Sequence, residues 1–157
     1  SIDRLIYEII ELLGGWFSPR MTRKRDRNES SPTASKPPSF LGLIDSVPLL
    51  KAQEKTEPRF LAPAISELAS DVDEWSDCFP GKVEFLLCWA AAGDQLQFCM
   101  LTRNDHWHPH KLGPQYFLHH IQQRVCVIRS AITIHRILSS QVLQLSADYI
   151  PLGHEHT

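Results

Sequence analysis

The chain has 157 residues, of which 43% are hydrophobic and 22% charged, and its formal net charge is −2. This composition excludes a wholly disordered chain, and the small net charge excludes a general affinity for nucleic acid or anionic membranes. The length predicts one domain. No apolar run approaches the ~20 residues that a membrane-spanning helix needs, so we expect no contact with membranes.

Residues 1–17 predict a short amphipathic helix that ends at Gly14-Gly15. Charged side chains interrupt the apolar positions and the start is not basic, so the segment is not a signal peptide. We therefore expect an intracellular protein, cytoplasmic or nuclear. A first residue Ser1 instead of Met is typical of a fragment or a processed product. The apolar positions are Ile2, Leu5, Ile6, Ile9, Leu12 and Leu13.

Residues 18–39 are rich in serine, proline and basic residues, which predicts a disordered linker. Its basic run is the candidate interaction segment. The run is typical of a solubilising linker or of a nuclear-import signal. Direct binding of nucleic acid through phosphates is a third, less favoured interpretation, because no aromatic residues interleave for base stacking. The run consists of Arg20, Arg23, Lys24, Arg25 and Arg27.

Residues 40–157 are expected to form a single globular domain. Apolar residues between 40 and 50, punctuated by Pro48, predict short helical turns, and Pro63 is placed as in the first turn of a helix. An acidic group follows, whose carboxylates could bind a divalent cation or serve acid–base chemistry. It lacks the glycine and glutamate of an EF-hand loop, so a solvated acidic turn is favoured. Its members are Asp71, Asp73, Glu74 and Asp77.

The clearest local pattern is a β-hairpin formed by residues 83–91 and 95–101, with Gly93-Asp94 as its turn. The alternation typical of strands is present, but both faces are apolar. A strand of this kind must be covered on both sides, so the hairpin is predicted to be a central layer of the fold.

Residues 114–145 predict a long amphipathic helix that starts near Pro114 and packs against the hairpin. The expected class is therefore α+β: a central antiparallel hairpin or sheet packed against a long C-terminal helix and shorter helices. His135 lies in the apolar stripe of this helix, and we expect it to be a hydrogen-bonded core histidine and not a pH switch. The stripe contains Leu118, Ile121, Val125, Ile128, Ile132, His135, Ser139 and Val142, and Phe117, Val127, Ile134, Ile137 and Leu138 widen it.

The densest group of potential metal ligands is His106, His108 and His110, followed by His119-His120. Alternate histidines on an extended segment point the same way, and Cys99 or Asp105 could complete a tetrahedral zinc site. No HExxH or CxxC motif accompanies them. A polar surface loop is favoured and no cofactor is expected, with a structural zinc ion as the alternative.

Four cysteines lie far apart in the sequence. Without a secretory signal they are expected to be buried free thiols, and a cross-strand disulfide between Cys88 and Cys99 is the alternative. The four are Cys78, Cys88, Cys99 and Cys126.

The run from Phe85 to Phe98, the long helix and the segment Tyr149-Ile150-Pro151-Leu152-Gly153 resemble a segment of fungal and oomycete kinase-like proteins of the Crinkler type. The resemblance covers residues 85–153. It implies an accessory module that precedes a kinase-like lobe. No kinase catalytic motif occurs in this chain, so the resemblance carries over no catalytic residue.

Together these patterns predict a non-enzymatic protein-interaction or accessory domain, associated with a kinase-like protein. The alternative is a zinc-binding protein or metal-dependent enzyme that uses His106, His108 and His110. A protein partner is expected, and the sequence leaves the oligomeric state open.

Overall fold

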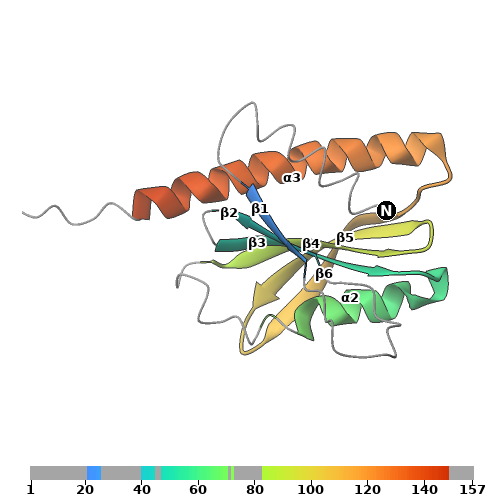
Figure 1. Ribbon diagram of the computed structural model, residues 1–157, viewed down its shortest axis with the longest axis horizontal. Coiled ribbons are helices and arrows are strands. Elements are labelled where there is room, and N and C mark those ends of the chain that lie inside the picture. The colour runs from blue at the N-terminus through green and yellow to red at the C-terminus, as the bar shows by residue number, and fades with distance from the viewer. Residues whose placement is uncertain (1–20, 26–39, 45–46, 71, 73–82, 149–157) are drawn as a thin grey trace, which may run out of the picture.

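The computed structural model describes residues 21–25, 40–44, 47–70, 72 and 83–148. In this part of the chain six strands form one sheet, with helix α3 across one face and helix α2 on the other (Figure 1). In chain order the elements are β1 (Met21–Arg25), β2 (Phe40–Ile44), β3 (Val47–Lys55), the 3-10 helix η1 (Pro58–Phe60), α2 (Leu61–Ser70), β4 (Phe85–Ala92), β5 (Gln95–Arg103), β6 (Trp107–Phe117) and α3 (Ile121–Asp148).

The strands lie in the sheet in their order along the chain, from β1 at one edge to β6 at the other. Neighbours run antiparallel except β3 and β4, which are parallel and are joined by a connection that contains α2. The predicted α+β class is confirmed. The sheet is mixed, however, and not antiparallel throughout as predicted. The parallel pairing of β3 with β4 depends on a crossover connection, and such a long-range pairing leaves no local pattern in the sequence.

β4 and β5 form the predicted hairpin, and their bounds agree with the expected strands to within two residues. The turn consists of Gly93 and Asp94. Gly93 has a φ of 58°, and a Cβ atom at this position would lie 2.7 Å from Cδ of Pro58. Backbone conformation and the close approach of η1 therefore both require glycine here.

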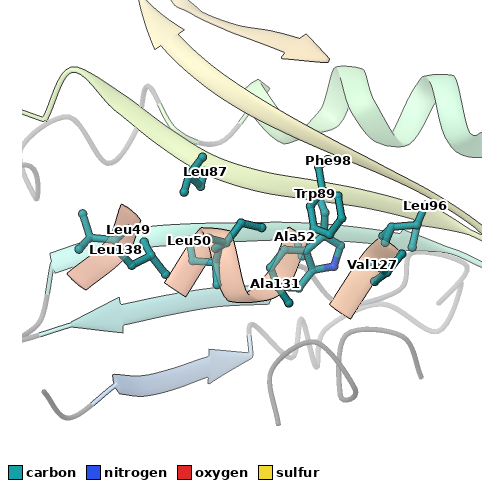
Figure 2. Packing of buried hydrophobic residues seen from close by; sticks show 12 residues of the cluster. Leu49, Leu50, Ala52, Leu87, Trp89, Leu96, Phe98, Val127, Ala131 and Leu138 are labelled. Carbon is teal, nitrogen blue, oxygen red and sulfur yellow. The ribbon is translucent and has the colours of Figure 1, made fainter. Parts of the chain in front are cut away.

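The α3 face of the sheet carries the larger side chains. Trp89 is fully buried at the centre of this cluster, near the small side chains of Ala52 and Ala131 (Figure 2). Ala52 is the register partner of Trp89, so a small residue leaves room for the indole ring. The buried members are Leu49, Leu50, Ala52, Leu87, Trp89, Ala91, Leu96, Phe98, Val127, Ala131, Ile134 and Leu138.

The α2 face is built from smaller side chains, which allow α2 to lie close to the sheet. Successive residues of β4 alternate between the two faces, so the hairpin is a covered central layer, as predicted. The buried members of this second cluster are Leu61, Ala64, Leu68, Val72, Leu86, Cys88, Ala90, Ala92, Cys99, Leu101 and Trp107.

The predicted start of the long helix near Pro114 was wrong. Pro114 lies within β6, and α3 begins seven residues later at Ile121. Proline fits an edge strand as well as a first helical turn, because in neither place is its missing N–H needed. The predicted surface loop containing His108 and His110 is also part of β6.

The helical turns predicted between residues 40 and 50 are strands β2 and β3. The register shifts by one residue beside Leu49, and this irregularity masks the strand pattern in the sequence. The predicted linker of residues 18–39 contains strand β1, which pairs with β2. The predicted helix of residues 1–17, the acidic group of residues 71–77 and residues 149–153 lie outside the described residues, except Val72.

Candidate functional site

The start of α3 is fixed to the turn of the β4–β5 hairpin. The backbone N–H of Leu118 donates to the carbonyl oxygen of Asp94 at 2.7 Å, and Nδ1 of His119 lies 2.5 Å from the Asp94 carboxylate. The side-chain oxygen of Gln123 accepts the N–H of Phe117 at 2.5 Å, and Nε of Arg124 donates to the carbonyl oxygen of Leu118. These contacts position the first turns of α3 on the sheet.

Four residues of α3, which we call the inner stripe, are buried against the sheet. They follow one another at steps of four, three and four, so they form one face of a helix with 3.6 residues per turn. Figure 2 shows Val127 near Leu96 and Leu138 near Leu49, so the helix crosses the sheet from β5 to β3. The inner stripe consists of Val127, Ala131, Ile134 and Leu138.

A second apolar stripe of α3, the outer stripe, faces away from the core. It consists of Ile121, Val125 and Ile128, which are 75%, 51% and 40% exposed. Steps of four and three again place them on one face, roughly 120° around the helix from the inner stripe. The half-buried Ile132 continues the same spacing. Three β-branched apolar side chains in a row on a helix surface form a candidate binding site, on which the apolar face of another segment could pack.

The charge next to the outer stripe is positive. Arg124, Arg129 and Arg136 are exposed, and the one acidic residue of α3 is Asp148 at its last position. At 100° per residue, Arg124 lies to one side of the outer stripe, and Arg129 and Arg136 lie to the other. The surface is therefore an apolar stripe with cationic margins.

The predicted zinc ligands lie on or beside the edge strand β6. His108 and His110 are exposed on the same face of the sheet, and Nε2 of His110 lies 2.7 Å from Oγ1 of Thr102. Cys99 is buried on the opposite face under α2, so it does not join them. Among the described residues, no three side chains of ligating type come together as a metal site would require. Zinc at His106, His108 and His110 stays a prediction that elemental analysis of purified protein tests.

Part of the basic run lies on the edge strand β1. Arg23, Lys24 and Arg25 pair with Gly42, Leu41 and Phe40 of β2. Arg20 and Arg27 lie outside the described residues. The structure therefore places part of this candidate segment on an edge strand.

The α2 face contains a buried polar group that no pattern in the sequence indicates. Lys51 is fully buried, and its Nζ donates to the carbonyl oxygen of Leu68 at 2.9 Å. Leu68 lies in the last turn of α2, where carbonyl oxygens lack helical partners, so the lysine caps the helix. Nearby, Glu67 accepts a hydrogen bond from Gln53 at 3.1 Å and pairs with Lys55 at 2.7 Å.

Cys88 and Cys99 are register partners under α2, and both thiols are free and fully buried, as predicted. Burial raises the pKa of the Cys88 thiol, and the hydrogen bond from this thiol lowers the pKa of Cys99. Cys126 of α3 is also free and is half-buried. The burial of Cys88 and Cys99 suits these thiols to packing instead of nucleophilic chemistry.

His135 is half-buried on α3, and its burial lowers the pKa of the ring. The apolar positions of this helix form two stripes, not the single wide stripe that was predicted. The signal was present, because ten hydrophobic residues of 121–138 cover far more than the width of one packed face.

Searches of protein-family models, curated proteins and solved structures find no match to this chain.

Proposed function

We propose that this chain is a protein-interaction module that binds an amphipathic helix with acidic residues along the outer stripe of α3. The single observation that carries the proposal is the exposure of Ile121, Val125 and Ile128 in one row. An exposed apolar row on a long helix is typical of helix-to-helix recognition, in which residues at steps of three and four contact the partner.

The arginines on both margins favour an acidic partner. Arg124, Arg129 and Arg136 are exposed and long enough to reach carboxylates beside the bound helix. Opposite charges at the margin of an interface mainly raise the association rate and select the partner, while apolar contacts provide most of the affinity.

The free edge of β6 supports strand addition less well. Pro109 and Pro114 lie in this strand, and both lack an N–H to donate to an added strand. The exposed Lys111 lies between them and opposes edge-to-edge pairing in the same way. The outer stripe carries no such obstacle.

The resemblance of residues 85–153 to Crinkler-type proteins leads us to propose a kinase-like protein as the source of the bound helix, with the module in the cytoplasm or the nucleus. The proposed role is accessory and not enzymatic. None of the helices in the described part of the chain is long and apolar enough to span a membrane.

The test is a fluorescence anisotropy titration of the full chain with a designed 18-residue amphipathic peptide that carries leucines on one face and glutamates at its margins. Val125→Asp places a carboxylate in the outer stripe and should weaken binding at least about tenfold, and added salt should weaken it further. Ala62→Asp puts the same charge on an exposed position of α2, on the other side of the sheet, and should leave the affinity unchanged.

Equal affinity of the wild-type chain and Val125→Asp would show that the peptide binds elsewhere. Absence of binding up to the solubility limit of the peptide, both to the wild-type chain and to a chain that carries Ile6→Asp and Ile9→Asp, would overturn the proposal.

A further inference from the structure

We infer that the outer stripe has an internal ligand: residues 2–13 of the same chain bind along it as an amphipathic helix and compete with the external partner. This inference rests on the proposed function, because it assigns an intramolecular competitor to the same surface. Three properties of the sequence and the structure support it: matching length, opposite charge and sufficient reach.

The apolar positions of the two segments have the same length. Ile2 and Leu13 are eleven residues apart, as are Ile121 and Ile132 on α3. At 1.5 Å per residue each row is about 16 Å long, so the two helices can be in contact over their full apolar length. A helix of about three turns is marginally stable alone in water and gains stability when its apolar face is covered.

The charges of the two segments are opposite. Asp3, Glu8 and Glu11 against Arg4 give residues 2–13 a formal charge of −2, since three negative charges and one positive charge are present. At 100° per residue, Asp3 and Glu8 lie on the two sides of the predicted apolar face. The outer stripe has arginines on both of its sides, so carboxylates would face guanidinium groups at both margins.

The connecting segment is long enough. From Leu13 to Met21, the first residue of β1, the chain takes eight steps and can span at most about 26–29 Å. The start of α3 packs on β5, four strand spacings or about 19 Å from β1. Residues 14–20 can therefore cross the sheet and bring the segment to the outer stripe.

A second copy of the chain fits this surface less well. Two α3 helices packed through their outer stripes would bring Arg124, Arg129 and Arg136 of one copy close to the same residues of the other. Like charges at a contact oppose association. Dimerisation through α3 is therefore an outcome that the experiment must separate from intramolecular binding.

The test compares the wild-type full chain with an opened variant, Ile6→Asp combined with Ile9→Asp, which removes the apolar face of residues 2–13 and leaves α3 unchanged. The designed acidic peptide should bind the opened variant at least about tenfold more tightly than the wild-type chain, because the competitor is lost. A synthetic peptide of residues 1–15 should bind the opened variant, and Val125→Asp in that variant should abolish this binding. Tyr7→Gln changes the same segment away from its apolar face, leaves its charge unchanged and serves as the matched control, with wild-type affinity expected.

The outcomes separate the two proposals. Equal affinity of the designed peptide for the wild-type chain and the opened variant, or failure of the 1–15 peptide to bind the opened variant, overturns the internal ligand and leaves the proposed function standing. Binding of neither peptide to either protein overturns both. A dimer of the wild-type chain in analytical ultracentrifugation that Val125→Asp dissociates would identify a second copy as the occupant and overturn the inference.

Discussion

The two helices cover opposite faces of one sheet, but they do so in different ways. α2 buries Leu61, Ala64 and Leu68, and its outward positions carry small residues such as Ala62 and Ser66. α3 buries its inner stripe and also exposes its outer stripe. The outer surface of α2 thus carries small side chains, whereas that of α3 carries a row of exposed apolar side chains.

The two covered faces differ in chemistry as well. The α3 face is apolar, with Trp89 at its centre, whereas the α2 face contains the buried side chains of Lys51 and Gln53. Buried polar groups must be paired, and those under α2 bond to the helix itself. The polar contacts therefore fix where α2 lies, while α3 is held by apolar packing, by the contacts at its start and by one hydrogen bond from Nε2 of Gln141 to the carbonyl oxygen of Phe85 at 3.4 Å.

The largest expected effect separates the inner and outer stripes. Val127→Asp places an unpaired carboxylate in the core and should lower the free energy of unfolding by about 3–5 kcal/mol. Val125→Asp, two residues earlier, should change it by at most about 0.5 kcal/mol, because this side chain is exposed. Urea denaturation followed by circular dichroism measures both. Similar losses in the two variants would show that the outer stripe is part of the core.

A smaller effect is expected from the polar contacts under α2. Lys51→Met keeps the length of the side chain but leaves the carbonyl oxygen of Leu68 without this donor, which should cost about 1–3 kcal/mol. Hydrogen exchange should become faster in the last turn of α2 and not in α3. A variant as stable as the wild-type chain would show that the lysine is not needed to hold α2.

Thiol labelling compares the two faces without any mutation. Cys88 and Cys99 lie in the α2 face at 0% exposure, whereas Cys126 of α3 is half-buried. N-ethylmaleimide should modify Cys126 at least about tenfold faster than Cys88 or Cys99 in the native protein, as mapped by mass spectrometry of peptides. Equally fast modification of all three would mean that α2 opens readily.

The smallest effect concerns the pH dependence of α3. Burial holds the pKa of His135 below its ordinary value of 6.5, so the unfolded chain takes up a proton before the folded one does. The folded state therefore has its full stability above the pKa of His135 in the unfolded chain. Part of this stability is lost as the pH falls through the pKa of His135 in the folded chain. Measured relative to His135→Gln, the free energy of unfolding of the wild-type chain should therefore be lower at about pH 5 than at about pH 8. A difference that stays constant with pH would show that the ring is equally solvated in both states.

The hairpin was predictable because its information is local. Gly93-Asp94 and the alternating apolar residues on both sides specify a two-residue turn between paired strands, and the structure confirms both. The start of α3 was not predictable, because Pro114 suits an edge strand and a first helical turn equally well. Only the pairing of β6 with β5 decides between them.

The sequence by itself determined the α+β class, the central hairpin and a long apolar helix after it, because periodicity and turn residues act over a few neighbouring positions. The tertiary structure decided which apolar residues of that helix are core and which are surface. Both stripes have helical spacing, and only the position of the sheet makes Val127 an inner residue and Val125 an outer one. For the same reason the burial of Lys51 became visible only when α2 was placed over β3, since burial is a property of the packed chain and not of a residue type.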